Sequence, residues 1–203
     1  MNHLGTVVLE TDRLILRPFQ QEDAKDMYNN WASSEAVTKY VTWPAHESMD
    51  QTEMILKIWV KNYVDPKCYQ WCLEYKENGE AIGSMGVVGM DETIDAVEIG
   101  YCIGESYWHR GITTEALRAV VQFLFEKAEC NRISARHDTK NPNSGKVMNK
   151  AGLQYEGTLV QAGKNNEGVC DLAVYGLTKA MYISRSHEDF VKETSENPLT
   201  RES

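Results

Sequence analysis

The stretch with the clearest chemical potential runs from Tyr107 to Glu115. A predicted strand leads there through a short loop, His109-Arg110-Gly111, directly into a predicted helix. The first turn of a helix leaves backbone N–H groups unpaired and carries partial positive charge. A glycine lets these groups approach a phosphate closely, and Arg110 can add a cation. The loop therefore indicates an anion site, although a glycine at such a turn also serves backbone geometry alone.

A second helix start lies at Asn141. This residue is a favourable N-cap, and Pro142 suits the first helical position because its missing N–H would be unpaired there anyway. The helix ends at Gly152, which suits a left-handed C-terminal cap. Ser144 therefore lies in the first turn of this helix. From the sequence alone, capping and contact with a ligand are equally good roles for the Asn141 side chain.

The sequence does not match two familiar nucleotide-binding motifs. The repeat Gly83-x-x-Gly86-x-x-Gly89 lacks the spacing of a dinucleotide-binding loop and opens no helix. Lys146 follows a Ser-Gly pair, but Val147 stands where a phosphate-binding loop needs Ser or Thr. Neither feature predicts a nucleotide cofactor of these two classes.

Length and charge narrow the function classes. The 203 residues suffice for one domain with a hydrophobic core. A net charge of -9 argues against a nucleic-acid partner, because a nucleic-acid binder carries a basic stripe that neutralises phosphates. An acidic surface suits a cationic substrate such as an amine, although many proteins are acidic for solubility alone.

The sequence shows neither a membrane span nor a secretion signal. No apolar run approaches the ~20 residues that cross a bilayer, and the N-terminus lacks a basic segment followed by an apolar core. We therefore expect a cytoplasmic protein with no membrane partner, in which the five cysteines are reduced thiols. Cys68 and Cys72 lie four apart without a histidine cluster, so no metal site is expected.

Hydrophobic periodicity predicts the elements that position these residues. Strands are predicted over residues 13–19, 69–75, 81–88, 97–103, 132–138, 155–161 and 169–177, and helices over 20–32, 48–64, 113–127 and 141–152. The 15-residue helix between the fourth and fifth strands indicates that these two strands are parallel in an otherwise antiparallel sheet. The fold class is therefore mixed α/β, or α+β, with a polar tail from about residue 184.

Four segments, in this order, resemble the GNAT superfamily of N-acetyltransferases and, within it, the RimJ/RimL branch of ribosomal-protein N-terminal acetyltransferases. They read TDRLILR from Thr11, EIGY from Glu98, YWHRGITTEAL from Tyr107 and NPNSGKVMNKAGL from Asn141. Four segments in the family's order are far more specific than any one alone. The resemblance spans about residues 8–180, which would form a GNAT domain, followed by a polar tail over 184–203.

The resemblance implies one mostly antiparallel, seven-stranded sheet with helices on both faces, splayed between its fourth and fifth strands. Acetyl-coenzyme A would lie in that gap, with its pantetheine arm paired to strand backbone and its pyrophosphate on the loop amides. Asn141 and Ser144 would flank the thioester. The cofactor-binding residues so implied are Ile99, Tyr101, Ile103, His109, Arg110, Gly111, Ile112, Thr113, Thr114, Asn141 and Ser144.

Two positions depart from the family's pattern. Thr113 stands where the pyrophosphate loop often has Gly or Ala, so the turn is expected to differ slightly. Met148 stands where many members carry a tyrosine that protonates the leaving thiolate, and methionine cannot donate a proton. The branch resemblance passes this catalytic role to Ser144.

Acetyl transfer needs a neutral amine, and Glu98 on the splayed strand is the candidate base, acting directly or through water. The alternative is a solvated strand carboxylate. His109 and His137 are weaker candidates, better explained as a loop contact and a packing residue, because no perturbing partner is visible. Cys102 lacks the histidine partner of an acetyl-cysteine mechanism. We therefore expect direct transfer between two bound substrates.

The acceptor remains open between a protein N-terminus and a small-molecule amine. It would bind residues 20–65 and the hairpin at 160–170, where aromatic residues gather, although core packing explains most aromatics at helical spacing. These aromatics are Trp31, Tyr40, Trp43, Trp59 and Tyr63. A catalytically silent acyl-coenzyme A sensor on the same fold is the alternative function. An exposed edge strand would permit a homodimer without requiring one.

Overall fold

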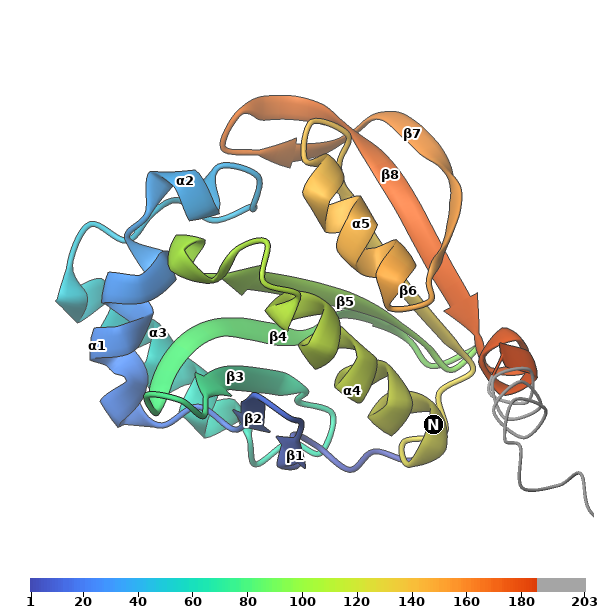
Figure 1. Cartoon of the computed structure of the whole chain (residues 1–203), viewed down its shortest axis with the longest axis horizontal. Helices are drawn as coiled ribbons and strands as arrows, with labels where there is room; N and C mark the ends of the chain where they lie inside the picture. Colours follow the sequence, from blue (N-terminus) through green and yellow to red (C-terminus); the bar gives the residue numbers. More distant parts are fainter. Residues whose placement is uncertain (186–203) are drawn as a thin grey trace, which may run out of the picture.

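One eight-stranded mixed sheet runs through the part of the chain that this computed structural model describes, residues 1–185 (Figure 1). The strand order is β1-β2-β3-β4-β5-β6-β8-β7. All neighbours pair antiparallel except β5 and β6, which are parallel. The strands are β1 (Leu9–Glu10), β2 (Leu14–Arg17), β3 (Gln70–Tyr75), β4 (Glu80–Asp91), β5 (Ala96–Ile103), β6 (Arg132–Asp138), β7 (Gln154–Asn165) and β8 (Gly168–Thr178).

The predicted mixed fold is confirmed, with one strand more than the seven expected. The additional strand is β1, whose Leu9 lies opposite Leu16 on β2. Two residues are too short to carry an alternating pattern, so periodicity does not reveal this strand. The hairpin predicted from Asn78-Gly79 joins β3 to β4, and Gly79 takes the left-handed conformation at φ 71°.

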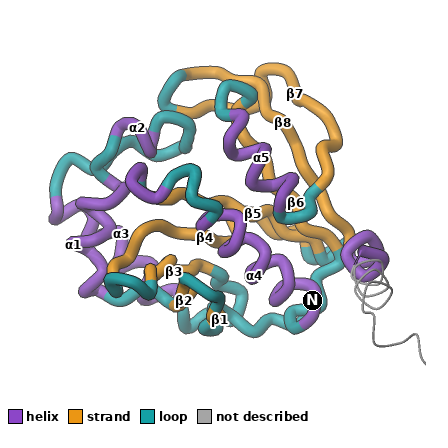
Figure 2. Tube along the Cα trace, viewed as in Figure 1, coloured by secondary structure: helices purple, strands orange, loops and turns teal. Residues whose placement is uncertain are grey.

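Helices cover both faces of the sheet, as expected (Figure 2). They are α1 (Ala24–Met27), α2 (Glu35–Thr38), α3 (Met49–Asn62), α4 (Ile112–Glu126) and α5 (Pro142–Lys150). The helix predicted over 20–32 is interrupted, because a π-helical turn, Tyr28–Ala32, follows α1. The sequence pattern misses α2, which is too short to show a helical face. Residues 179–185 are helical, and the predicted tail lies outside the described residues from 186 onward.

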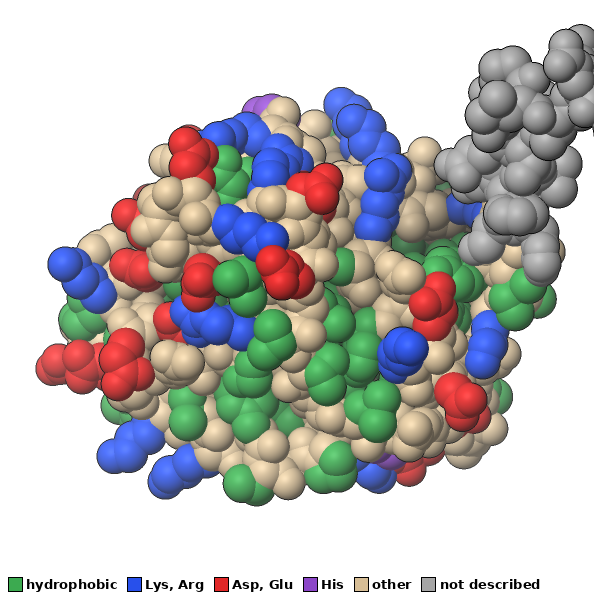
Figure 3. Space-filling view, turned by 60° about the horizontal axis from the view of Figure 1, so that its bottom comes forward, with side chains coloured by type: hydrophobic (Ala, Val, Ile, Leu, Met, Phe, Trp, Pro, Cys, Tyr) green, Lys and Arg blue, Asp and Glu red, His purple; other side chains and the backbone are tan. Residues whose placement is uncertain are grey.

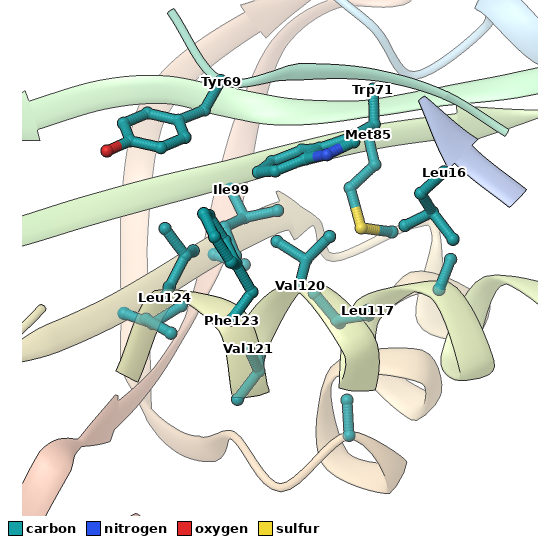
Figure 4. Close-up of a cluster of buried hydrophobic side chains, with 14 of the residues drawn as sticks. Leu16, Tyr69, Trp71, Met85, Ile99, Leu117, Val120, Val121, Phe123 and Leu124 are labelled. Carbon is teal, nitrogen blue, oxygen red and sulfur yellow. The ribbon is translucent and has the colours of Figure 1, made fainter. Parts of the chain in front are cut away.

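The larger hydrophobic core lies between the sheet and α4 (Figure 4). Val120 and Phe123 on α4 face Trp71 on β3, and the Phe123 and Trp71 rings meet edge-on with centroids 5.8 Å apart. The segment from Phe19 to Leu56 forms a second core on the opposite face. Each large buried apolar side chain contributes about 1.5–3 kcal/mol to folding. A packed core on each face of the sheet therefore stabilises the strands.

The sheet opens between β5 and β6. The parallel pairing joins only residues 96–98 to residues 132–134. From there β6 pairs with β8 along its whole length, whereas β5 stays with β4, so the two strands diverge (Figures 1 and 2). This is the predicted splay between the fourth and fifth predicted strands. The strands that diverge carry Glu98 and Arg136 at the point of separation.

The surface carries mixed charge. On the face shown in Figure 3, acidic and basic side chains lie interspersed among apolar and polar ones. In residues 1–185, no helix is both long and apolar enough to cross a membrane.

Removal of the Phe123 ring is expected to destabilise the fold strongly. The residue is 5% exposed and packs against two aromatic rings of β3 and the residue before it. Phe123→Ala should lower the free energy of unfolding by about 3–5 kcal/mol, measured by urea denaturation. Met54→Ala on α3 is the control, because Met54 is 62% exposed and its truncation should cost well under ~1 kcal/mol. Equal losses in the two variants would contradict this account of the core.

Candidate active site

A cavity of about 1050 Å³ follows the gap between β5 and β6. Its walls come from residues 36–43, α3, β5, the loop before α4, the start of α5 and the β7–β8 hairpin. It brings together predicted site residues that lie up to 46 positions apart in sequence. Those that line it are Glu98, Ile99, Tyr101, Ile103, His109, Gly111, Thr113, Thr114, Asn141 and Ser144.

The loop before α4 presents unpaired amides to this cavity. His109 and Gly111 both take the left-handed conformation, at φ 59° and 75°. Gly111 is the N-cap of α4 and has no side chain to cap it. Within the described residues, the amides of residues 109–114 have no hydrogen-bond acceptor. Together with the positive end of the α4 dipole, these N–H groups form a site suited to an anion.

Two predicted loop residues, Arg110 and Ile112, do not line the cavity with their side chains, whereas the predicted phosphate contact concerns the loop amides. The Arg110 guanidinium lies over the rings of Tyr75 and Tyr107, 5.5 and 5.6 Å from their centroids. It also donates to Tyr75 Oη at 3.2 Å, so it adds no cation to the cavity wall. The Ile112 side chain is fully buried in the core, which leaves only its backbone amide for a ligand.

One edge of β5 is free of strand neighbours beyond its first three residues. The N–H of Gly104, directly after β5, donates to the Ile82 carbonyl on β4 at 2.8 Å. Successive residues of a strand turn their N–H and C=O groups to opposite sides. Counting back from Gly104, the backbone groups of Ile99, Tyr101 and Ile103 therefore face the gap.

The indole of Trp108 occupies one of these backbone positions. Its Nε1 donates to the Ile103 carbonyl at 2.9 Å and ties the loop to the end of β5. The pairing of Glu98 with Ser134 keeps the Ile99 N–H within the parallel ladder. The groups left open on this edge are therefore the Ile99 carbonyl, both backbone groups of Tyr101 and the Ile103 N–H. The first of them lies next to Glu98, where the two strands separate.

The Tyr101 side chain crosses the gap to α5. Its Oη lies 3.0 Å from Ser144 Oγ and donates to the Ser144 carbonyl at 3.0 Å. Burial raises the pKa of the Tyr101 phenol, so the phenol keeps its proton at neutral pH. The Ser144 hydroxyl is thereby held at the start of α5, beside the cavity.

Asn141 stands at the N-cap of α5, as predicted, but its side chain makes no capping hydrogen bond. A capping side chain needs an extended backbone at the N-cap, and Asn141 instead has φ -110° and ψ 66°. Its carbonyl accepts from the Ser144 N–H at 3.1 Å. The side chain lines the cavity and is free of the capping role that the sequence suggested.

Glu98 lies on the face of β5 that points away from α4, because its neighbours Val97 and Ile99 are buried under that helix. Its Oε1 accepts from Arg136 Nε on β6 at 2.7 Å, and 24% of its side chain is exposed. Its Oε2 has no hydrogen-bond partner in residues 1–185. The carboxylate is therefore oriented by one oxygen and available through the other.

His137 packs as expected. Its Nδ1 lies 2.7 Å from the Asp138 carbonyl, which makes Nδ1 the protonated nitrogen. Its ring lies 5.7 Å from that of Tyr175, under Gly145 of α5. These contacts place His137 beneath the helix, on the face of β6 opposite Arg136, where it also lines the cavity.

The cysteines carry no sign of an activated thiolate. Burial raises the pKa of the Cys102 thiol, whose Sγ lies 3.4 Å from Ser84 Oγ. All five thiols are free. Over the described residues, no group of three or more His, Cys, Asp or Glu side chains could hold a metal ion.

Three aromatic residues from the 36–43 segment and α3 also line the cavity: Tyr40, Trp43 and Trp59. We call this part of the wall the aromatic end. Trp31, also considered from the sequence, is instead fully buried in the second core. Tyr63 does not line the cavity either, and its hydroxyl donates to the Gln70 carbonyl at 2.7 Å. Periodicity could not separate Trp59 from Tyr63, since one lies on α3 and the other is its C-cap.

Asn166, at the tip of the β7–β8 hairpin, connects the hairpin to the segment that carries Tyr40 and Trp43. Its Nδ2 donates to the carbonyls of Thr38 and Trp43, both at 2.8 Å. Lys39 and Glu167 add an exposed ion pair of 3.6 Å, a type that contributes little alone. No sequence signal marks Asn166, because its partners lie 123 and 128 residues away.

Comparison with known proteins identifies the family to which this arrangement belongs. Residues 13–154 match the model of the acetyltransferase (GNAT) domain. The N-acetyltransferase YoaA of Bacillus subtilis is 31% identical over 172 residues, which cover 85% of this chain and 97% of the relative. The ribosomal-protein-serine acetyltransferase of Escherichia coli is 31% identical over 101 residues, 50% of this chain and 56% of the relative.

The chain belongs to the GNAT acetyltransferase family. A solved structure of a RimL acetyltransferase in complex with coenzyme A has the same fold, with a TM-score of 0.76 at 18% identity. It covers 85% of this chain and 98% of that one. The expected class, a GNAT acetyltransferase that uses acetyl-coenzyme A, is thereby confirmed.

Binding of acetyl-coenzyme A to this GNAT domain is expected to depend on Gly111. Gly111→Glu would place a negative charge in the anion site and strain a left-handed position, so calorimetry should show at least about tenfold weaker binding. Gly79→Glu is the matched control, because Gly79 has a similar φ of 71° and does not line the cavity. Affinity equal to that of the wild type in folded Gly111→Glu would contradict the anion site.

Proposed function

We propose that the protein transfers the acetyl group of acetyl-coenzyme A directly to a primary amine, with Glu98 as base and Ser144 as proton donor. The observation that carries this proposal is the separation of β5 from β6, which places a carboxylate and a fixed hydroxyl on one cavity. Acetyl-coenzyme A supplies the acetyl group as a reactive thioester. The residues then have to position two substrates and move two protons.

The chain's own groups fit the donor substrate. The open carbonyl of Ile99 and the open backbone of Tyr101 can pair with the amides of the pantetheine arm. The unpaired amides of residues 109–114 can bind the pyrophosphate. Asn141 adds a side-chain amide to the wall of the same cavity, since it makes no cap. The proposal keeps the roles expected from the sequence, except for the cation from Arg110.

Glu98 is the group best placed to accept the proton of the attacking amine. Arg136 holds its Oε1, which keeps the carboxylate oriented while Oε2 faces the amine or a water molecule between them. A positioned carboxylate of this kind accelerates proton transfer about 10²–10⁴-fold. The neutral amine that results can attack the thioester carbonyl.

Ser144 is the group best placed to protonate the leaving sulfur. Tyr101 keeps its own proton and donates toward the Ser144 oxygens, so the serine hydroxyl can turn its proton to the sulfur. The first turn of α5 also stabilises negative charge, worth about 0.3–1 kcal/mol. Met148, on the same helix, is 1% exposed and offers no proton.

The acceptor in this proposal is a protein N-terminus, with small-molecule amines as the alternative. The name of one relative, the ribosomal-protein-serine acetyltransferase of Escherichia coli, supports a protein as the acceptor. The aromatic end of the cavity suits the apolar part of an acceptor, whose amine would point to Glu98.

The test is a mass-spectrometric screen of a bacterial cell extract supplied with isotope-labelled acetyl-coenzyme A and purified protein. Labelled acetyl groups on protein N-termini, absent with Glu98→Gln, would support the proposal. Labelled small amines would select the other acceptor class. Tight cofactor binding without any labelled product would instead favour a silent acyl-coenzyme A sensor.

Replacement of Glu98 should slow turnover without weakening cofactor binding. Glu98→Gln removes the basic oxygen but keeps the shape, so kcat should fall about 100-fold while the Kd of acetyl-coenzyme A stays within about twofold. Arg136→Met is the companion variant, because it frees the carboxylate without removing it and should cost less. Steady-state kinetics and calorimetry measure both, and a wild-type rate in Glu98→Gln would return Glu98 to a solvated carboxylate.

Loss of the Ser144 hydroxyl should lower kcat about 10- to 100-fold, with cofactor binding changed by less than ~1 kcal/mol. The effect is modest because a thiolate is already a fair leaving group. Tyr101→Phe, which leaves the hydroxyl but releases it, should give a smaller loss in the same direction. If Ser144→Ala keeps full turnover and only melts earlier, the serine serves the helix and not the reaction.

A further inference from the structure

Arg13, in the turn before β2, reaches from the edge of the sheet to the loop before α4. Its Nη1 donates to the backbone carbonyl of Arg110 at 2.9 Å. Its Nε and Nη2 both lie 2.7 Å from Glu115 Oε2, in the first turn of α4. The Arg13 side chain thus binds both the loop and the first turn of the helix that follows it.

Glu115 is held by the same turn through its second oxygen. Oε1 accepts from Thr11 Oγ1 at 2.6 Å and from the Arg13 N–H at 2.9 Å. Burial alone would raise the pKa of Glu115, but the hydrogen bonds from Thr11 and Arg13 outweigh it and hold the pKa below its usual value. The carboxylate is therefore charged and fully occupied, and it keeps the Arg13 guanidinium fixed.

This contact sets the direction of one peptide group. In a planar trans peptide, the C=O and the following N–H point to opposite sides. The C=O of Arg110 and the N–H of Gly111 belong to the same peptide. Because Arg13 holds the carbonyl on one side of the loop, the Gly111 N–H is directed to the other.

The two sides of the loop are different cavities. Arg13 and Glu115 line a smaller cavity of about 540 Å³, and neither lines the large one between β5 and β6. Gly111 and Thr114 line both, so the loop is the wall between them. Arg13 thus contacts the loop from the side opposite the anion site, and the Gly111 N–H faces the large cavity.

The contacts of Arg13 and Thr11 with Glu115 also affect the charge at the start of α4. A carboxylate in the first helical turn competes with a bound phosphate for the same positive helix end. Arg13 and Thr11 use all of its oxygen contacts on the far side of the loop, which removes that competition. The helix gains an acidic residue near its start, and the amides stay open to an external anion.

We propose that Arg13, held by Glu115 and Thr11, is a positioning residue for phosphate recognition: it fixes the Arg110–Gly111 peptide so that its N–H faces the pyrophosphate, without touching the cofactor. The inference rests on the proposed binding of the pyrophosphate to this loop. It predicts a role that depends on the phosphates of the donor and not on its thioester. A purely structural tie between β2 and α4 would affect every acetyl donor alike.

The experiment compares acetyl-coenzyme A with S-acetyl-pantetheine, a donor with the same thioester but no phosphates. Arg13→Met keeps the aliphatic stem and removes every guanidinium donor. We expect the Kd and KM for acetyl-coenzyme A to rise about tenfold or more, with kcat within about twofold. The kcat/KM for S-acetyl-pantetheine should stay within about twofold of the wild type.

Lys76→Met is the matched control. Lys76 Nζ donates to the Thr11 carbonyl at 2.6 Å and to Glu10 Oε1 at 2.7 Å. It therefore ties down the same N-terminal turn without contacting the loop or Glu115. This variant should leave the kinetics of both donors unchanged.

Three outcomes would overturn the proposal. A Kd and KM of Arg13→Met for acetyl-coenzyme A equal to those of the wild type would remove Arg13 from phosphate recognition. Equal losses with both donors would reduce it to a structural tie. A wild type that binds acetyl-coenzyme A no more tightly than S-acetyl-pantetheine would refute the pyrophosphate site itself, a failure of the proposed function. If Arg13→Met does not fold, Arg13→Lys decides, since a single ammonium cannot grip both partners: an intermediate, phosphate-dependent loss supports the role.

Discussion

The rest of the site depends on the point at which β5 and β6 stop pairing. Three residues of parallel ladder hold the strands together, and after Glu98 each strand follows a different antiparallel neighbour. Backbone N–H and C=O groups that lose a strand partner need another one. The free edge of β5, which begins at the Ile99 carbonyl and includes Tyr101, therefore supplies both an opening and unpaired backbone groups for a ligand with amides.

The same separation places the polar groups. Each of the two parallel strands is followed by a helix, so α4 and α5 both begin at the ends of their strands, where ligands of open sheets commonly bind. The start of α4 gives unpaired amides, and the start of α5 gives Asn141 and Ser144. Tyr101 spans the opening from β5 to α5, and Arg136 on β6 orients Glu98 on β5. The firm cores under α4 and beneath the first helices keep these groups in register.

Local sequence signals predicted the elements well because their causes are local. Asn141-Pro142 marked a helix start and Gly152, at φ 103°, its end. Contacts between distant segments stayed hidden. The sequence could not show that Arg110 would lie on Tyr75 and Tyr107, or that the Asn141 side chain would not cap. The Asn166 contacts and the grip of Arg13 on Glu115 likewise appear only in three dimensions.

The central claim, that the free edge of β5 receives the donor substrate, is tested most directly by residue-resolved amide exchange measured by NMR, with and without acetyl-coenzyme A. Without the ligand, the amide of Tyr101 should exchange faster than those of Gly100 and Cys102, which pair with β4. With the ligand, protection should rise at Tyr101 and residues 109–114. Binding that leaves the exchange at Tyr101 unchanged would contradict the account.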